Sequence, residues 1–158
     1  MLFYNEDWIH FVWVRYSAGI DVTEAELRKY IYSLKDTQVT DFVMNLNGTI
    51  SMSDSNVLET FADKFLATEE NGMPVDYKNT YAAEAYKIIH ERKLDMYRVW
   101  IDALNEIGIN SWLSFRMNDC HGNMTEGADL RRSSMVDRYP ENHIAAHRER
   151  RGYFDKRI

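Results

Sequence analysis

The chain has 158 residues, of which 45% are hydrophobic and 28% charged, a balance that is typical of one soluble globular domain and excludes global disorder. The formal net charge of -6 argues against general nucleic-acid binding, because such binding requires Lys and Arg to neutralise phosphates. Cys120 is the one cysteine, so no disulfide can form within this chain and no oxidising compartment is required.

The beginning of the chain predicts neither a signal peptide nor a membrane span. Glu6 and Asp7 stand where a signal peptide would be basic, and no run approaches the roughly 20 apolar residues of a transmembrane helix. The sequence also lacks a glycine-rich loop of the kind that cradles phosphates. We therefore expect a cytoplasmic protein with no membrane partner and no cofactor.

The first half of the chain predicts two strands with a helix between them. Residues 8–15 are almost continuously apolar and rich in aromatic and β-branched side chains, which predicts a strand buried on both faces. Thr23 and Glu26 form a capping box that begins a helix over residues 23–36. Residues 39–46 are again mostly apolar and predict the second strand.

The second half of the chain predicts two further helices and a third strand. Val57, Leu58, Phe61 and Phe65 mark a short helix, and a loop is expected over residues 68–78. Apolar side chains at spacings of three and four predict a long helix over residues 80–107, with Gly108 as its left-handed C-terminal cap. Residues 109–115 predict the third strand, which runs into a polar stretch.

Strands that alternate with helices indicate βαβ units and, with right-handed crossovers, a parallel sheet. The predicted class is therefore α/β, in a single domain over residues 1–158 that becomes polar from about residue 122. A closed (β/α)8 (TIM) barrel takes about 250 residues, so a chain of this length could form only a partial barrel, with about three strands. Both outer strands of such a partial barrel have open edges.

Polar residues follow all three predicted strands, where parallel α/β folds bind their ligands. Side chains there that suit a ligand covered in hydroxyl groups, or one with a carboxylate, are Arg15, Asn45, Asn47, Arg116, Asn118, Asp119 and His121. For Asn45 and Asn47, the turn preference of Asn beside Gly48 is an equally good explanation. For the cluster from Arg116 to His121 we favour function, because these four side-chain types rarely gather through turn preference alone.

Neither a metal site nor a cysteine nucleophile is predicted. Asp119 and His121 could share one face of a strand, but a catalytic zinc site usually has three protein ligands and no third is evident. Cys120 and His121 are adjacent, so on an extended chain their side chains point to opposite faces. The metal is therefore left unassigned and the catalytic residues unknown.

The third predicted strand also carries a family resemblance. Residues 112–122, which read WLSFRMNDCHG, resemble a stretch of bacterial glycosyl-hydrolase-like (β/α)8 barrel proteins. Residues 100–109 are similar to the helix before that stretch, and residues 139–141 and 152–155 to the loops after it. The resemblance implies the N-terminal portion of a sugar-cleaving or sugar-binding barrel, in which carboxylates on later strands do the chemistry.

These observations predict a partial glycoside-hydrolase-like segment with a carbohydrate-binding rim and without its own catalytic acid and base. An alternative is a noncatalytic half-barrel that works by homo-oligomerisation through its open sheet edges. A third hypothesis is that the basic residues after Arg131 bind an anionic partner such as RNA, although the overall charge makes nucleic acid an unexpected partner.

Overall fold

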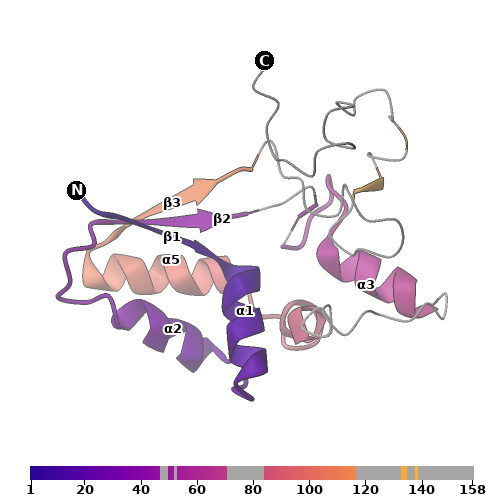
Figure 1. The fold of residues 1–158 in the computed structure, drawn as a ribbon, viewed down its shortest axis with the longest axis horizontal. Coiled ribbons are helices and arrows are strands. Elements are labelled where there is room, and N and C mark those ends of the chain that lie inside the picture. Colours follow the sequence, from indigo (N-terminus) through magenta and orange to yellow (C-terminus); the bar gives the residue numbers. More distant parts are fainter. Residues whose placement is uncertain (47–49, 52, 71–83, 117–132, 135–137, 139–158) are drawn as a thin grey trace, which may run out of the picture.

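A three-stranded parallel sheet forms the centre of the protein, as seen in a computed structural model (Figure 1). The strands lie in the order β1 (Phe3–Asp7), β2 (Asp41–Asn45) and β3 (Asn110–Ser114). The α/β class and the parallel sheet are therefore confirmed, and β2 and β3 lie inside their predicted segments. The structure describes residues 1–46, 50–51, 53–70, 84–116, 133–134 and 138.

The segment that the sequence predicts as the first strand is a helix, so that prediction is wrong. α1 (Trp8–Ser17) occupies this segment, and its buried side chains, Trp8, Phe11 and Val12, recur at helical spacing. Asp7 begins the helix, because its carboxylate accepts a hydrogen bond from the backbone N–H of Ile9. A short apolar run fits a buried strand and a buried helix equally well, and here the N-cap decides between them.

β1 comes directly before α1 and has a composition that does not suggest a strand, with the sequence FYNED. This segment is a strand because it pairs with the central strand β2, and in this pairing Asp7 lies opposite Asn45. On the other side of β2, Asn45 is paired with Ser114 of β3. The three strands therefore end in one row, which consists of Asp7, Asn45 and Ser114.

Two helices, α2 (Glu24–Tyr32) and α5 (Met96–Ile107), cover one face of the sheet (Figure 1). α2 begins at Thr23 as predicted, because the Thr23 hydroxyl accepts a hydrogen bond from the backbone N–H of Glu26. Gly108 ends α5 with a φ of 76°, which confirms the predicted left-handed cap.

The prediction of a single long helix over residues 80–107 is wrong for the first half of that segment. A helical segment passes into a π-helix (Lys87–Glu91), and the helix then stops before α5 starts afresh. Asp95 is the N-cap of α5, since its carboxylate accepts from the backbone N–H of Arg98. Lys93, with a φ of 53°, turns the chain in the left-handed region between the two helices.

Aromatic side chains beneath the sheet hold these elements together. The fully buried ring of Trp100 in α5 lies edge-on to Phe42 of β2, with ring centroids 5.7 Å apart. The same ring lies 5.4 Å from Phe11 of α1 and 5.8 Å from Tyr30 of α2. One tryptophan therefore packs against the sheet and two helices at once, at distances that are typical of favourable aromatic pairs.

The opposite face of the sheet carries none of the described helices (Figure 1). Trp112 and Phe3 lie on this face and are 53% and 56% exposed. The carboxylate of Asp41 is buried there and accepts hydrogen bonds from the Trp112 indole N–H at 2.8 Å and the Asn110 amide at 3.2 Å. Together with the Thr40 hydroxyl, these donors hold the pKa of Asp41 below its ordinary value.

The remaining described residues lie to one side of the sheet. α3 (Phe61–Glu70) continues past residue 68, where the sequence predicts a loop, and residues 71–78 of that loop lie outside the described part. Of the polar segment from about residue 122, Ser133 and Ser134 donate hydrogen bonds to the carboxylate of Glu59, at 3.0 and 2.8 Å. Within the described part, no helix combines the length and the apolar character that crossing a membrane requires.

Replacement of Trp100 by Ala removes the ring that connects the sheet, α1 and α2. We expect the free energy of unfolding to fall by about 3–5 kcal/mol, the usual cost of deleting a buried tryptophan. Urea unfolding followed by far-UV circular dichroism measures this change. The matched control is Trp13→Ala, at a half-exposed position on α1, for which a loss within about 0.5 kcal/mol is expected. Equal losses in the two variants would contradict the central role of Trp100.

Candidate functional site

The carboxyl edge of the sheet carries the row of Asp7, Asn45 and Ser114, and Arg116 lies just beyond it. The Arg116 guanidinium reaches back to the Asp7 carboxylate, with 3.4 Å between nitrogen and oxygen. Neighbouring strands lie about 4.8 Å apart, so an ion pair from β3 to β1 must pass the end of the central strand. The polar groups of all three strands therefore form one continuous site.

Asn45 is the central residue of this row and is only 1% exposed. Neither the nitrogen nor the oxygen of its side-chain amide has a hydrogen-bond partner among the described residues. Its backbone carbonyl, by contrast, accepts a hydrogen bond from the Tyr97 hydroxyl at 2.7 Å. Buried amides are nearly always hydrogen-bonded in proteins, so an unpaired one indicates a place where water or a ligand supplies the partner.

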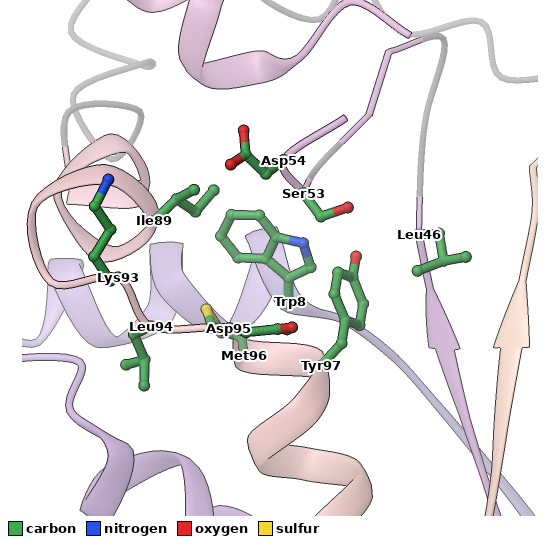
Figure 2. A pocket seen from close by; sticks show the side chains of 10 residues that line it. All are labelled: Trp8, Leu46, Ser53, Asp54, Ile89, Lys93, Leu94, Asp95, Met96 and Tyr97. Atoms are coloured by element: carbon green, nitrogen blue, oxygen red, sulfur yellow. The ribbon is translucent and has the colours of Figure 1, made fainter. Parts of the chain in front are cut away.

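A pocket of about 370 Å³ opens beside the row (Figure 2). Its position follows from the fold, because Trp8 comes directly after β1, Leu46 directly after β2, and Tyr97 from the first turn of α5. Ten residues line it: Trp8, Leu46, Ser53, Asp54, Ile89, Lys93, Leu94, Asp95, Met96 and Tyr97. Clefts at the carboxyl ends of parallel strands are the usual ligand sites of α/β folds.

The pocket combines an apolar interior with a charged entrance. Trp8, Met96 and Tyr97 are buried, whereas Asp54, Lys93 and Asp95 are exposed at its rim. In Figure 2 the Trp8 ring occupies the middle of the group, and Asp54 and Asp95 lie on different sides of it. The pocket therefore offers apolar surface inside and both donors and acceptors at the opening.

Tyr97 connects the pocket with the row of polar residues. Burial and the nearby Asp7 carboxylate raise the pKa of Tyr97 well above its ordinary value, so the hydroxyl stays protonated at neutral pH. It can therefore keep donating its hydrogen bond to Asn45. This contact fixes the first turn of α5 against the end of β2.

α1 and α5 both begin at the pocket, but the partial positive charge at each helix N-terminus is already offset by a carboxylate. Asp7 caps α1 and Asp95 caps α5, each by accepting a backbone N–H within the first turn. A carboxylate at a helix N-terminus offsets the partial positive charge of the helix dipole. The two helix ends therefore contribute little net attraction for an anionic ligand.

The structure brings two of the predicted site residues together and corrects a third. Asn45 and Arg116 lie at the same edge of the sheet, as the sequence predicts. Arg15 does not, because the segment that contains it is a helix rather than a strand. Its guanidinium instead stacks on the rings of Phe11 and Tyr30, at 4.4 and 5.6 Å, between α1 and α2. Four further predicted residues lie outside the described part: Asn47, Asn118, Asp119 and His121.

Three residues of the site were not predicted from the sequence, namely Asp7, Trp8 and Tyr97. A signal for Asp7 was present, since an Asp directly before a run with apolar residues at helical spacing is typical of a helix N-cap. No such signal existed for Trp8 or Tyr97, whose apolar positions in the sequence look the same as those of ordinary core residues.

Within the described part of the chain, no group of three His, Cys, Asp or Glu side chains is placed to hold a metal ion. In comparisons with known proteins, no family model matches the chain and no curated protein matches it significantly. The site is therefore interpreted from its own geometry and chemistry.

The two roles of Asp7, as helix cap and as ion-pair partner, can be separated by mutation. Asp7→Ser keeps an N-cap acceptor but removes the charge, so we expect it to lower the free energy of unfolding by at most about 1 kcal/mol. Arg116→Gln should cost a similar amount, because the ion pair is partly exposed to solvent. Asp7→Ala also removes the cap and should cost about 1 kcal/mol more than Asp7→Ser. Chemical unfolding of the three variants measures these differences, and equal losses for Ser and Ala would contradict the capping role.

Proposed function

We propose that this protein binds a carbohydrate in the pocket at the carboxyl edge of the sheet and does not hydrolyse it. The observation that carries the proposal is the make-up of this pocket, whose apolar interior adjoins a rim of hydroxyl, ammonium and carboxylate groups. Sugars match such a surface, because their C–H groups are apolar and each hydroxyl both donates and accepts hydrogen bonds. Arg116 and Asn45 extend the same polar rim across the ends of the strands.

The arrangement of the sheet supports the further proposal that the chain is part of a glycoside-hydrolase-like (β/α)8 barrel. The strands follow one another in sequence order, and α2 and α5 lie on the same face of the sheet (Figure 1). Barrels have this arrangement, since all their helices form one outer layer. Doubly wound sheets instead reverse their strand order and carry helices on both faces.

The chemistry of the pocket favours binding over hydrolysis. Glycosidases ordinarily need two carboxyl groups that flank the scissile bond, one of which donates a proton. Asp95 is engaged as the N-cap of α5, where its carboxylate accepts a hydrogen bond from the Arg98 backbone N–H at 3.0 Å. Asp54 is exposed at the rim and suits a hydrogen bond to a sugar hydroxyl.

Isothermal titration calorimetry with methyl glycosides and short oligosaccharides tests the binding proposal. Asp54→Ala and Lys93→Gly each remove one charged hydrogen-bonding group from the rim and should weaken binding about tenfold. Glycine accepts the left-handed backbone at position 93, so Lys93→Gly should not destabilise the fold. The matched control is Glu91→Ala, which removes an exposed carboxylate outside the pocket and should leave the affinity unchanged.

Two results would contradict this proposal. Absence of heat or chemical-shift change with every saccharide at millimolar concentration would exclude carbohydrate binding. Release of nitrophenol from aryl glycosides by the purified chain, lost in Asp54→Ala, would show that the pocket is catalytic.

A second candidate function is self-association through the uncovered face of the sheet. It is favoured by the exposed rings of Phe3 and Trp112 on that face, since large apolar side chains at an open sheet are typical of interfaces. A homodimer would bury both rings about a two-fold axis.

Sedimentation velocity over a range of concentrations tests this second candidate. The sedimentation coefficient of the wild-type protein should increase as its concentration rises through the micromolar range. The Phe3→Ser variant should stay closer to the monomer value. Val57→Ser is the matched control, because Val57 is also strongly exposed but lies outside the sheet. A wild-type protein that stays monomeric throughout would rule self-association out.

A further inference from the structure

The indole N–H of Trp8 is an unpaired hydrogen-bond donor inside the pocket. Trp8 is 1% exposed and lines the pocket, and its nitrogen has no hydrogen-bond partner among the described residues. An indole nitrogen can only donate, so it needs an acceptor oxygen. A buried donor that lacks one destabilises the free protein and favours any ligand that supplies it.

The nearby protein groups do not satisfy this donor. The Tyr97 hydroxyl lies close enough for the indole to lower the phenol's pKa, against the larger effects of burial and Asp7, but the indole N–H does not reach hydrogen-bond geometry with any described residue. The Tyr97 proton is directed to the Asn45 carbonyl instead. In Figure 2 the indole nitrogen is on the side of the ring where Ser53 and Tyr97 lie. The nitrogen itself has almost no exposed surface, so an acceptor reaches the N–H when Ser53 or Tyr97 moves aside.

Trp100 shows that an unpaired indole N–H alone does not make a ligand site. Its nitrogen is also buried and unpaired among the described residues, yet its ring is packed against Phe11, Tyr30 and Phe42. It does not line the pocket. The difference between the two tryptophans is therefore the space beside Trp8, and Trp100 becomes an internal control.

The charges around the pocket indicate what kind of acceptor fits. Two carboxylates, Asp54 and Asp95, face one ammonium group, Lys93, at the rim. The helix N-termini add little positive potential, because Asp7 and Asp95 cap them. Because Asp95 is offset by the helix end that it caps, Asp54 is the rim carboxylate that repels an anionic ligand, whereas hydroxyl groups can donate to Asp54 and accept from Trp8.

We propose that the ligand of this pocket is an uncharged sugar that places an oxygen acceptor on the Trp8 indole N–H, and that Asp54 excludes its anionic analogues. This inference rests on the proposed carbohydrate function and narrows it to neutral saccharides. Trp8 acts as the donor that orients the sugar, and the Asp54 carboxylate sets the specificity.

A heteronuclear NMR titration of the indole N–H signals tests the inference on the intact chain. The probes are cellobiose and a matched pair that differs in charge, methyl β-glucoside and methyl β-glucuronide. The chain has 4 Trp, and Trp→Phe variants assign their signals. We expect the Trp8 signal to move downfield and to exchange more slowly when a neutral probe binds, while the Trp100 signal stays in place.

A substitution that removes only the N–H separates this contact from the packing of the ring. Benzothienylalanine at position 8 keeps the size of the indole and replaces the nitrogen by sulfur. We expect it to weaken binding of the neutral probe about tenfold, the effect of one lost hydrogen bond in a buried site. The same substitution at position 100 should leave the affinity unchanged. In Asp54→Asn, the glucuronide should gain affinity relative to the glucoside.

The outcomes distinguish this inference from the proposed function. Neutral saccharide binding with an unmoved Trp8 signal would overturn the role of Trp8 and leave carbohydrate binding intact. Binding of the glucuronide as tightly as the glucoside would overturn the charge selectivity alone. Failure of every saccharide to bind would overturn both the proposed function and the inference that rests on it.

Discussion

The parallel register of the three strands is the constraint on which the site depends. Pairing of Asp7 with Asn45, and of Asn45 with Ser114, places three strand ends in one row. A shift of β1 by one residue would exchange the two faces of that strand, moving Tyr4 away from the ring of Phe42, against which it stacks. The core beneath the sheet therefore specifies the register, and the register in turn assembles the polar edge.

The core and the pocket share the same helices, so the base of the site is packed into the core while its rim is open. α5 buries Trp100 beneath the middle of the sheet and presents Tyr97 to the pocket one turn earlier. α1 likewise packs Phe11 into the core and leaves Trp8 at the pocket. The unpaired groups of Asn45 and Trp8 are thus held at the edge by packing elsewhere, a pattern typical of sites that are preformed for a ligand.

The elements that could be predicted are those whose sequence signals lie within a few residues of one another. The Thr23 cap, the Gly108 cap and the buried strand β2 follow from short-range rules, and Asn45 and Arg116 were found because their strands were. β1 could not be found in this way, since its polar sequence becomes a strand only through pairing with a distant segment. Arg15 was misplaced as a direct consequence, because the apolar run of α1 took the place of the true strand.

The two surfaces that the fold leaves open are separate, and this separation bears on how they can work. Ligand binding involves the carboxyl edge, where Trp8 and Tyr97 line the pocket. Self-association would involve the uncovered face, where Trp112 is held by its hydrogen bond to Asp41, a residue at the opposite end of β2 from Asn45. Trp112 itself is paired with Val43, two residues before Asn45, so what separates it from the pocket is the origin of the lining residues, several of which belong to α1 and α5 on the other face of the sheet. Covering the face therefore need not block the pocket, and the two proposed functions are physically compatible within one chain.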